Sequence, residues 1–186
     1  TAGSGTVSSD TFINFSNLTV HSGTWTLLGP MLGAASTTTL NGGVLRFDNS
    51  GAFGSGLITG NGGNLQAAVS GLNLANNISI GAGGLTVSGA NTLGLTGGLT
   101  GTGVLTKTGN GTLRLYTANN HASTVLSGGR LQLSNAAALG TGALTVGADA
   151  TLENVGAMTL ANAIQLDAGL TLDGSSALSC SSCRIC

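Results

Sequence analysis

Apolar and polar residues alternate in short segments of three residues along most of the chain. Two aliphatic side chains flank one polar side chain in Leu18-Thr19-Val20, Leu85-Thr86-Val87 and Ile164-Gln165-Leu166. The same pattern recurs at residues 25–27, 72–74, 78–80, 93–95, 113–115, 131–133, 144–146 and 170–172. An alternation of period two is typical of a β-strand that buries one face. Glycine-rich stretches separate these alternating segments and supply the positive-φ positions of tight turns. The pattern therefore predicts many short strands and no helix.

A long internal repeat indicates how these strands are organised. Residues 38–93 and 124–178 are two copies of one sequence, related by a shift of 86 positions. Under this shift Leu45 aligns with Leu131, and residues 72–78 align with residues 158–164. Repetition at a fixed period is typical of a solenoid, in which each unit buries its apolar face against its neighbours. The period is too long for one solenoid turn, so each copy should contain several turns.

Short strands joined by tight turns also fit an antiparallel sandwich or barrel. Three features favour a parallel β-helix: the connections are short and glycine-rich, the repeat preserves its spacing, and the inward positions are aliphatic throughout. We therefore expect an all-β fold, a right-handed parallel β-helix (β-solenoid), as a single elongated domain of roughly eight rungs with about 20–25 residues each. At a strand spacing of about 4.8 Å, the rungs would form a rod about 40 Å long. The residues expected inside are Leu45, Leu74, Ile80, Val87, Leu113, Leu115, Leu131, Leu133, Val146, Leu160 and Leu172.

Composition narrows the possible partners. Charged residues make up only 6% of the chain and hydrophobic residues 41%, which favours a buried core over a disordered chain. The net charge of −1 comes from scattered single charges, so we expect no binding of nucleic acid. No apolar run approaches the ~18 residues of a membrane span, and we expect no membrane insertion by this chain. The first residues lack the features of a signal peptide, which leaves a removed signal or an internal piece of a longer protein.

One segment resembles a known family. Residues 101–115 read GTGVLTKTGNGTLRL, which closely resembles the passenger-associated transport repeat of bacterial autotransporters, with its pattern G-x-G-x-L-T-K-x-G-x-G-T-L-x-L. Residues 129–135 then match the G-x-L-x-L-x-N that follows in that family. The resemblance implies part of a type V secreted passenger domain on the bacterial outer-membrane surface or outside the cell. In that family the β-helix serves as a stalk and adhesive surface, so the implied partners are host or bacterial cell surfaces.

The chain departs from its own repeat near the end. After Leu178 the first copy predicts a continuation like residues 94–99, whereas the sequence reads SCSSCRIC. We therefore divide the chain into a β-helix of residues 1–178 and a cysteine-containing tail of residues 179–186. Cys180, Cys183 and Cys186 supply three thiols where a zinc site usually needs four ligands. We expect no metal there; a capping segment without a ligand, or a disulfide within the tail, fits better.

Candidate catalytic groups are dispersed. Asp10, Asp48, Asp149, Glu153, Asp167 and Asp173 spread over the whole chain, whereas an enzymatic β-helix gathers its acids and bases on one face. Asp167 and Asp173, six residues apart, flank strand segments and could share a face, but we interpret both as polar residues at strand ends. We interpret His21 and His121 as single polar turn residues. The sequence also lacks calcium-binding nonapeptides and a phosphate loop, so we expect no enzyme, no catalytic residue and no cofactor.

Two functions remain open. The first is an adhesive or structural passenger, whose surface patch would include Trp25 with Phe12, Phe15, Phe47 and Phe53. The second is a rod that associates with itself and stacks end to end into filaments, because unpaired strand edges at the ends of a solenoid recruit other chains. In that case the edges would be exposed near residues 170–178 and near residues 12–20.

Overall fold

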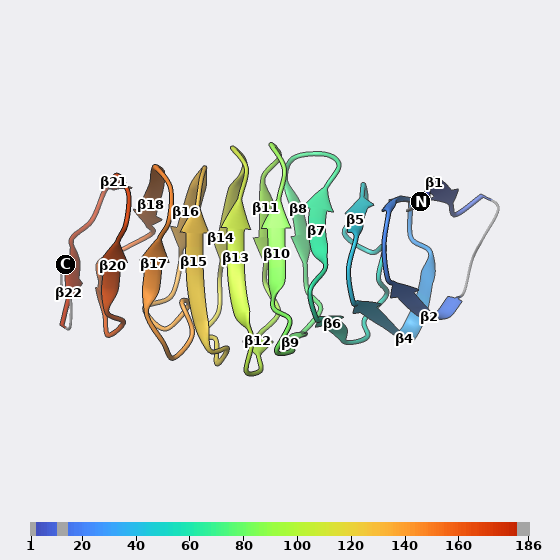
Figure 1. Ribbon diagram of the computed structural model, residues 1–186, viewed down its shortest axis with the longest axis horizontal. Helices are drawn as coiled ribbons and strands as arrows, with labels where there is room; N and C mark the ends of the chain where they lie inside the picture. Colours follow the sequence, from blue (N-terminus) through green and yellow to red (C-terminus); the bar gives the residue numbers. More distant parts are fainter. Residues whose placement is uncertain (1–2, 11–14, 182–186) are drawn as a thin grey trace.

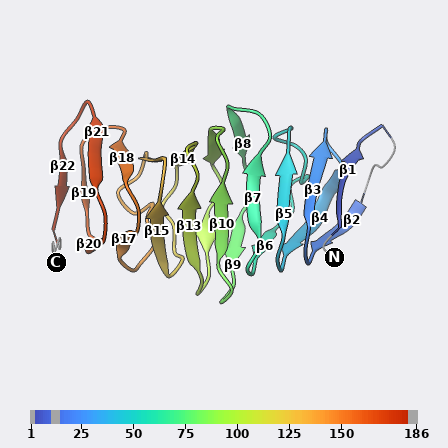
Figure 2. The same cartoon turned by 45° about the horizontal axis from the view of Figure 1, so that its top comes forward.

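The computed structural model describes residues 3–10 and 15–181. These residues form 22 strands and no helix, and every strand pairing is parallel. The strands stack side by side along the long axis of the molecule, with the two chain ends at opposite ends of the stack (Figures 1 and 2). The all-β parallel solenoid expected from the alternation is therefore confirmed.

The strands belong to three faces of the solenoid. The nine-stranded sheet contains β1 (Ser4–Ser8), β3 (Thr24–Leu28), β5 (Val44–Phe47), β7 (Asn64–Ala67), β10 (Leu85–Ser88), β13 (Val104–Thr108), β15 (Ser123–Ser127), β17 (Leu144–Val146) and β20 (Ile164–Leu166). The six-stranded sheet contains β8 (Leu72–Leu74), β11 (Leu93–Leu95), β14 (Thr112–Leu115), β16 (Arg130–Leu133), β18 (Ala150–Asn154) and β21 (Leu170–Gly174). The five-stranded sheet contains β2 (Phe15–Val20), β4 (Leu32–Leu40), β6 (Ile58–Gly60), β9 (Ile78–Ile80) and β12 (Leu99–Thr100), and a two-stranded sheet pairs β19 (Met158–Leu160) with β22 (Leu178–Cys180).

One turn of the solenoid takes about 20 residues. In the nine-stranded sheet Ser4 pairs with Thr24, Thr24 with Val44, and Val44 with Asn64. Nine strands in one sheet correspond to nine turns, one more than the roughly eight expected, because each turn lies at the short end of the expected length. At the C-terminal end, β22 includes Ser179 and Cys180, so regular pairing continues two residues past the predicted boundary at 178.

The core is a stack of aliphatic columns. Leu45 and Leu65 are in register and both are fully buried, and Leu113 and Leu131 form the same arrangement in the six-stranded sheet. Of the eleven residues expected inside, all are buried except Leu172, for which the prediction was wrong. Leu172 is 62% exposed. Its strand β21 is the last strand of its sheet, so Leu172 lies in register with buried Leu152, but no further turn among the described residues covers it.

The 86-residue repeat spans four turns and one additional face. Pairing follows Leu45 through Leu65, Val87 and Lys107 to Leu126, all in the nine-stranded sheet. The repeat, however, aligns Leu45 with Leu131, which lies in the next strand, β16, of the six-stranded sheet. The prediction of several turns per copy is therefore confirmed, and equivalent strands of the two copies lie on different faces.

The repeat also preserves a corner of the solenoid. The loop between β5 and β6 and the loop between β16 and β17 each insert an Ala and a larger apolar side chain into the core: Ala52 with Phe53, and Ala138 with Leu139. The residues after these pairs, Gly54 and Gly140, both have positive φ, a conformation that glycine adopts without strain. The segment 136–139 is accordingly a turn rather than a helix.

Candidate functional site

The predicted acidic residues do not form one site. Asp48 Oδ1 accepts a hydrogen bond from Gly29 N (2.7 Å), and Asp149 Oδ1 accepts one from Gly169 N (2.9 Å). Each bond connects turns that are adjacent along the solenoid, as the 19- and 20-residue separations show. Asp167 follows β20 of the nine-stranded sheet and accepts from Gln165 Nε2 (3.0 Å). These carboxylates satisfy nearby backbone and amide donors at strand ends.

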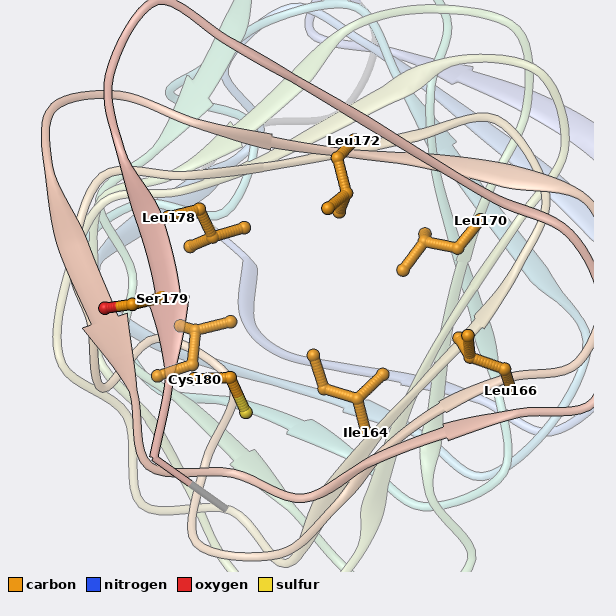
Figure 3. A pocket seen from close by; sticks show the side chains of 8 residues that line it. Ile164, Leu166, Leu170, Leu172, Leu178, Ser179 and Cys180 are labelled. Atoms are coloured by element: carbon orange, nitrogen blue, oxygen red, sulfur yellow. The ribbon is translucent and has the colours of Figure 1, made fainter. Parts of the chain in front are cut away.

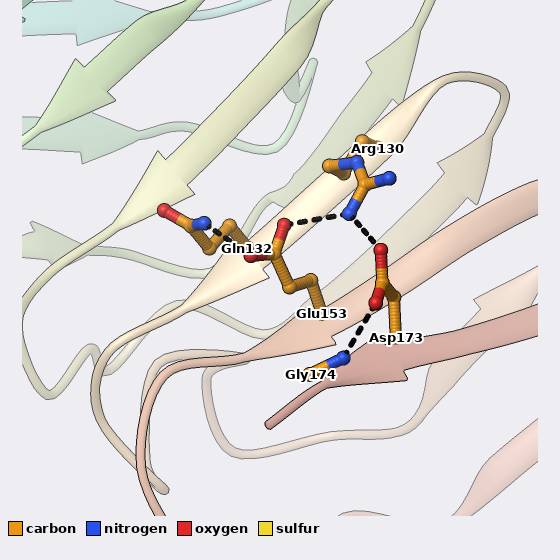
Figure 4. A network of polar contacts seen from close by, with 5 residues as sticks. All are labelled: Arg130, Gln132, Glu153, Asp173 and Gly174. Carbon is orange, nitrogen blue, oxygen red and sulfur yellow. Dashed lines mark hydrogen bonds and ion pairs between the residues drawn. The ribbon is translucent and has the colours of Figure 1, made fainter. Parts of the chain in front are cut away.

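Glu153 and Asp173 lie in a charged network on the outer face of the six-stranded sheet (Figure 4). Arg130 Nη1 donates to Glu153 Oε2 (2.7 Å) and to Asp173 Oδ2 (2.6 Å). Gln132 Nε2 donates to Glu153 Oε1 (2.7 Å). The hydrogen bond from Arg130 lowers the pKa of the Asp173 carboxyl, and Arg130 in turn has a raised pKa. A general acid or base needs a pKa near the working pH, whereas the pKa of Asp173 is lowered and both carboxylates are paired with Arg130.

Asp167 and Asp173 are therefore not brought together as a catalytic pair. Asp173 belongs to β21 of the six-stranded sheet, and Asp167 follows a strand of the nine-stranded sheet. Their hydrogen-bond partners are also different, Arg130 for Asp173 and Gln165 for Asp167.

Lys107 is a buried residue that was not expected from the sequence. Its side chain is 2% exposed, and Nζ donates to the carbonyl oxygens of Thr108 (2.8 Å), Gly109 (2.8 Å) and Gly128 (3.3 Å). The amine thus connects the turns of two neighbouring rungs. Burial lowers the pKa of Lys107 to about 8. The strand pattern contained the signal, because Lys107 has the same parity as the inward Leu105.

His121 corrects an interpretation from the sequence. It was expected to be a polar turn residue, but it is fully buried. Its Nε2 lies 2.9 Å from Thr124 Oγ1, and that hydroxyl donates its only proton to Leu139 O (2.9 Å). Nε2 must therefore carry the donated hydrogen, while Nδ1 has no hydrogen-bond partner among the described residues. Burial lowers the pKa of His121 to about 4, so the imidazole is neutral near pH 7.

The C-terminal end of the described solenoid is an apolar hollow of about 160 Å³. Figure 3 shows its aliphatic side chains pointing inward around an open centre. It is lined by Leu160, Ile164, Leu166, Leu170, Leu172, Leu178, Ser179 and Cys180. Cys180 is disulfide-bonded; Cys183 and Cys186 lie outside the described residues. The exposed edge expected near residues 170–178 therefore coincides with an apolar surface.

The opposite end is partly closed by Trp25. A hollow of about 250 Å³ there includes Val7, Leu18, Val20, Trp25, Leu27 and Leu45 in its lining. Trp25 is in register with Gly5 and Leu45, so its ring lies on the inward face. A Cβ at Gly5 would approach that ring to 2.7 Å, which explains the glycine. The indole Nε1 donates to Ser22 O (3.1 Å).

The expected aromatic surface patch does not form from the described residues. Phe47 and Phe53 are fully buried and pack edge to face, with ring centroids 5.0 Å apart. They fill the core because the corner after β5 turns Phe53 inward against Phe47. Phe15 is 37% exposed, and Phe12 lies outside the described residues.

Within residues 3–10 and 15–181, no three His, Cys, Asp or Glu side chains gather as metal ligands would. The same residues include no helix with the length and apolar character needed to cross a membrane. Comparison of the chain with family models, with curated proteins and with solved structures finds no match.

Proposed function

We propose that this chain is an extracellular structural β-helix from an autotransporter-like passenger, which serves as a stalk or a surface-adhesion scaffold. The observation that carries the proposal is the stack of mostly aliphatic core columns through nine parallel turns. Such a stack gives a stiff rod whose outer faces are free to contact other surfaces.

The resemblance of residues 101–115 to the passenger-associated repeat supports the same function. This segment forms β13 and β14, on two faces of one rung, and contains the buried Lys107. Three backbone carbonyls of two stacked turns surround its amine. A residue that connects successive turns suits this resemblance, which implies that folding of such repeats outside the cell assists export.

The disulfide at Cys180 supports an extracellular location. Disulfides persist in oxidising compartments and are rare in the cytosol. Charged residues are few, and the Glu153 and Asp173 carboxylates are paired with Arg130. Both observations support a non-catalytic role.

Adhesion is tested with beads coated with the purified chain. We expect the coated beads to remain attached to bacterial or mammalian cells under flow more often than beads coated with heat-unfolded protein. Replacing Asp167 and Asp173 together by Asn should leave attachment unchanged, because neither acts catalytically. Equal detachment of folded and unfolded coats would contradict the adhesive role and leave only the stalk.

A second candidate function is self-assembly into filaments by end-to-end stacking. The apolar hollow at the C-terminal end favours it, because Leu170, Leu172 and Leu178 present aliphatic surface there. A head-to-tail contact repeats without closing and gives an open filament. We expect Leu172→Asp to abolish filaments seen by electron microscopy and Val155→Asp, at another exposed apolar residue, to leave them intact. A wild type that stays monomeric at high concentration would exclude this function.

A further inference from the structure

The three outer faces of the solenoid differ in charge. The strands of the six-stranded sheet contain Arg114, Arg130, Glu153 and Asp173. Among the outward positions of the nine-stranded sheet, only Arg46 is charged, since Lys107 points inward and is buried. The longest face of the molecule is therefore almost neutral.

This neutral face presents uncharged polar and β-branched side chains in register. One column of paired outward residues runs along the whole sheet: Ser4, Thr24, Val44, Asn64, Thr86, Thr106, Val125, Thr145 and Gln165. A second column begins with Thr6, Thr26, Arg46 and Gln66. Neighbouring members of a column are about 4.8 Å apart, and nine strands extend the array to about 40 Å.

The array is rigid. Its side chains stand on a continuous parallel sheet, whose front strands follow one another along the long axis in Figure 1. Some side chains of the array are also hydrogen-bonded to each other: Gln66 Nε2 donates to Ser88 Oγ (2.6 Å), and Ser88 Oγ donates to Asn64 Oδ1 (2.9 Å). A preorganised surface loses little conformational entropy when it binds.

We propose that the outer face of the nine-stranded sheet binds the flat surface of an ordered, neutral polysaccharide, such as a β-linked glucan. Hydroxyl and amide side chains can both donate to and accept from sugar hydroxyls. The methyl groups of threonine and valine offer apolar contact to the C–H faces of the sugar rings. A periodic polymer meets the array at many weak contacts at once, which multiply the affinity. This inference rests on the proposed adhesive function and names its partner class.

The other partners and faces fit less well. A nucleic acid or an anionic polysaccharide requires many basic side chains, and this face supplies Arg46 alone. The five-stranded sheet also carries a hydroxyl column, with Thr39, Thr59 and Ser79 in register. It contains five strands against nine, however, so its column extends over about 20 Å. A shorter column offers a periodic polymer fewer simultaneous contacts.

The test is sedimentation of the purified chain with insoluble cellulose and chitin, and with anionic heparin beads, at low salt and at 1 M NaCl. We expect retention on the neutral polymers at both salt concentrations, because neutral contacts are not screened. Thr86→Lys with Thr106→Lys changes adjacent outward residues of the nine-stranded sheet and should weaken retention at least tenfold. The matched control, Thr59→Lys with Ser79→Lys on the five-stranded sheet, should be retained like the wild type.

Circular dichroism and urea unfolding check that both pairs fold. Should the lysine pair unfold, Thr86→Val with Thr106→Val removes the same hydroxyls at nearly constant volume and is expected to weaken retention. The proposal is overturned if the wild type sediments with neither cellulose nor chitin, or if it is retained on heparin alone. It is also overturned if both lysine pairs lose retention on the neutral polymers equally. If coated beads still attach to cells in any of these cases, the polysaccharide is wrong and the adhesive function stands.

Discussion

Asn76 and Asn162, 86 residues apart, make the same pair of hydrogen bonds. Asn76 Nδ2 donates to the carbonyl oxygens of Gly54 (3.2 Å) and Gly56 (2.8 Å). Asn162 Nδ2 donates to those of Gly140 (3.0 Å) and Gly142 (2.6 Å). The two corners join different pairs of sheets, so the corner is a hydrogen-bonded unit that keeps its form on whichever face it is placed.

Removal of either asparagine should destabilise the fold. Asn76 is 4% exposed, and Asn76→Ala leaves two corner carbonyls without their donor. We expect a loss of about 1–3 kcal/mol in the free energy of unfolding, measured by urea titration. The exposed Asn73→Ala serves as the control and should change stability by less than about 0.5 kcal/mol. Equal losses in both variants would show that the corner bonds contribute nothing specific.

Lys107 should stabilise the fold through the hydrogen bonds of its amine and not through the packing of its alkyl chain. Lys107→Met keeps a long apolar side chain but leaves the carbonyls of Thr108, Gly109 and Gly128 without a donor. We expect a loss of roughly 2 kcal/mol or more in urea unfolding at pH 7. Arg46→Met, which replaces an exposed cation, provides the comparison and should be nearly neutral. A Lys107→Met variant as stable as the wild type would show that the three bonds only offset the cost of burying the amine.

The same residue predicts a rise in stability at alkaline pH. Burial lowers the pKa of Lys107 from its ordinary value of 10.5 to about 8 in the folded chain. Between these values the unfolded chain binds more protons than the folded one, so the free energy of unfolding rises with pH. We expect the wild type to gain stability relative to Lys107→Met from pH 8 to 10.5 in parallel urea titrations. A constant difference over this range would contradict the lowered pKa.

The alternation of residues along the chain was sufficient to predict the fold, but not the buried polar groups. Inward positions such as Leu45 and Leu131 follow from period two, because one face of every strand must be buried. Leu172 satisfies the same pattern and is exposed, since burial at the last turn depends on what stacks beyond it. Lys107 was missed although it has the parity of the inward Leu105, because lysine is rarely buried without partners and one of its partners, Gly128 O, lies 21 residues away. His121 contacts Thr124, three residues away, whose hydroxyl donates to Leu139 O of the next turn, and a local pattern does not reveal that contact.

His121 should make the fold sensitive to acid. Its pKa is lowered from 6.5 to about 4 by burial, so the unfolded chain binds the proton more readily between these values. Stability is fully present above pH 6.5 and falls as the pH drops from 6.5 to 4, by roughly 3 kcal/mol in total. Protonation would place a hydrogen on Nδ1, which has no acceptor among the described residues.

Comparison of His121→Gln with His21→Gln measures this contribution. The first variant should lose the fall in stability between pH 6.5 and 4, whatever its stability at pH 7. The second replaces an exposed imidazole and should keep the wild-type slope. The acid sensitivity would have another origin if His121→Gln retained the full slope.

Because the last turn is open, we expect identical substitutions along one core column to reduce the free energy of unfolding by different amounts. Leu131, Leu152 and Leu172 are in register, but only Leu172 is exposed. Leu152→Ala should lose about 2–5 kcal/mol, because it leaves a cavity inside the stack, whereas Leu172→Ala should lose less than about 1 kcal/mol. Urea unfolding at several protein concentrations measures both. If Leu172→Ala proved as costly as Leu152→Ala, and the cost grew with concentration, a second copy would cover this end in solution, as the filament requires. A large cost independent of concentration would contradict the open end itself.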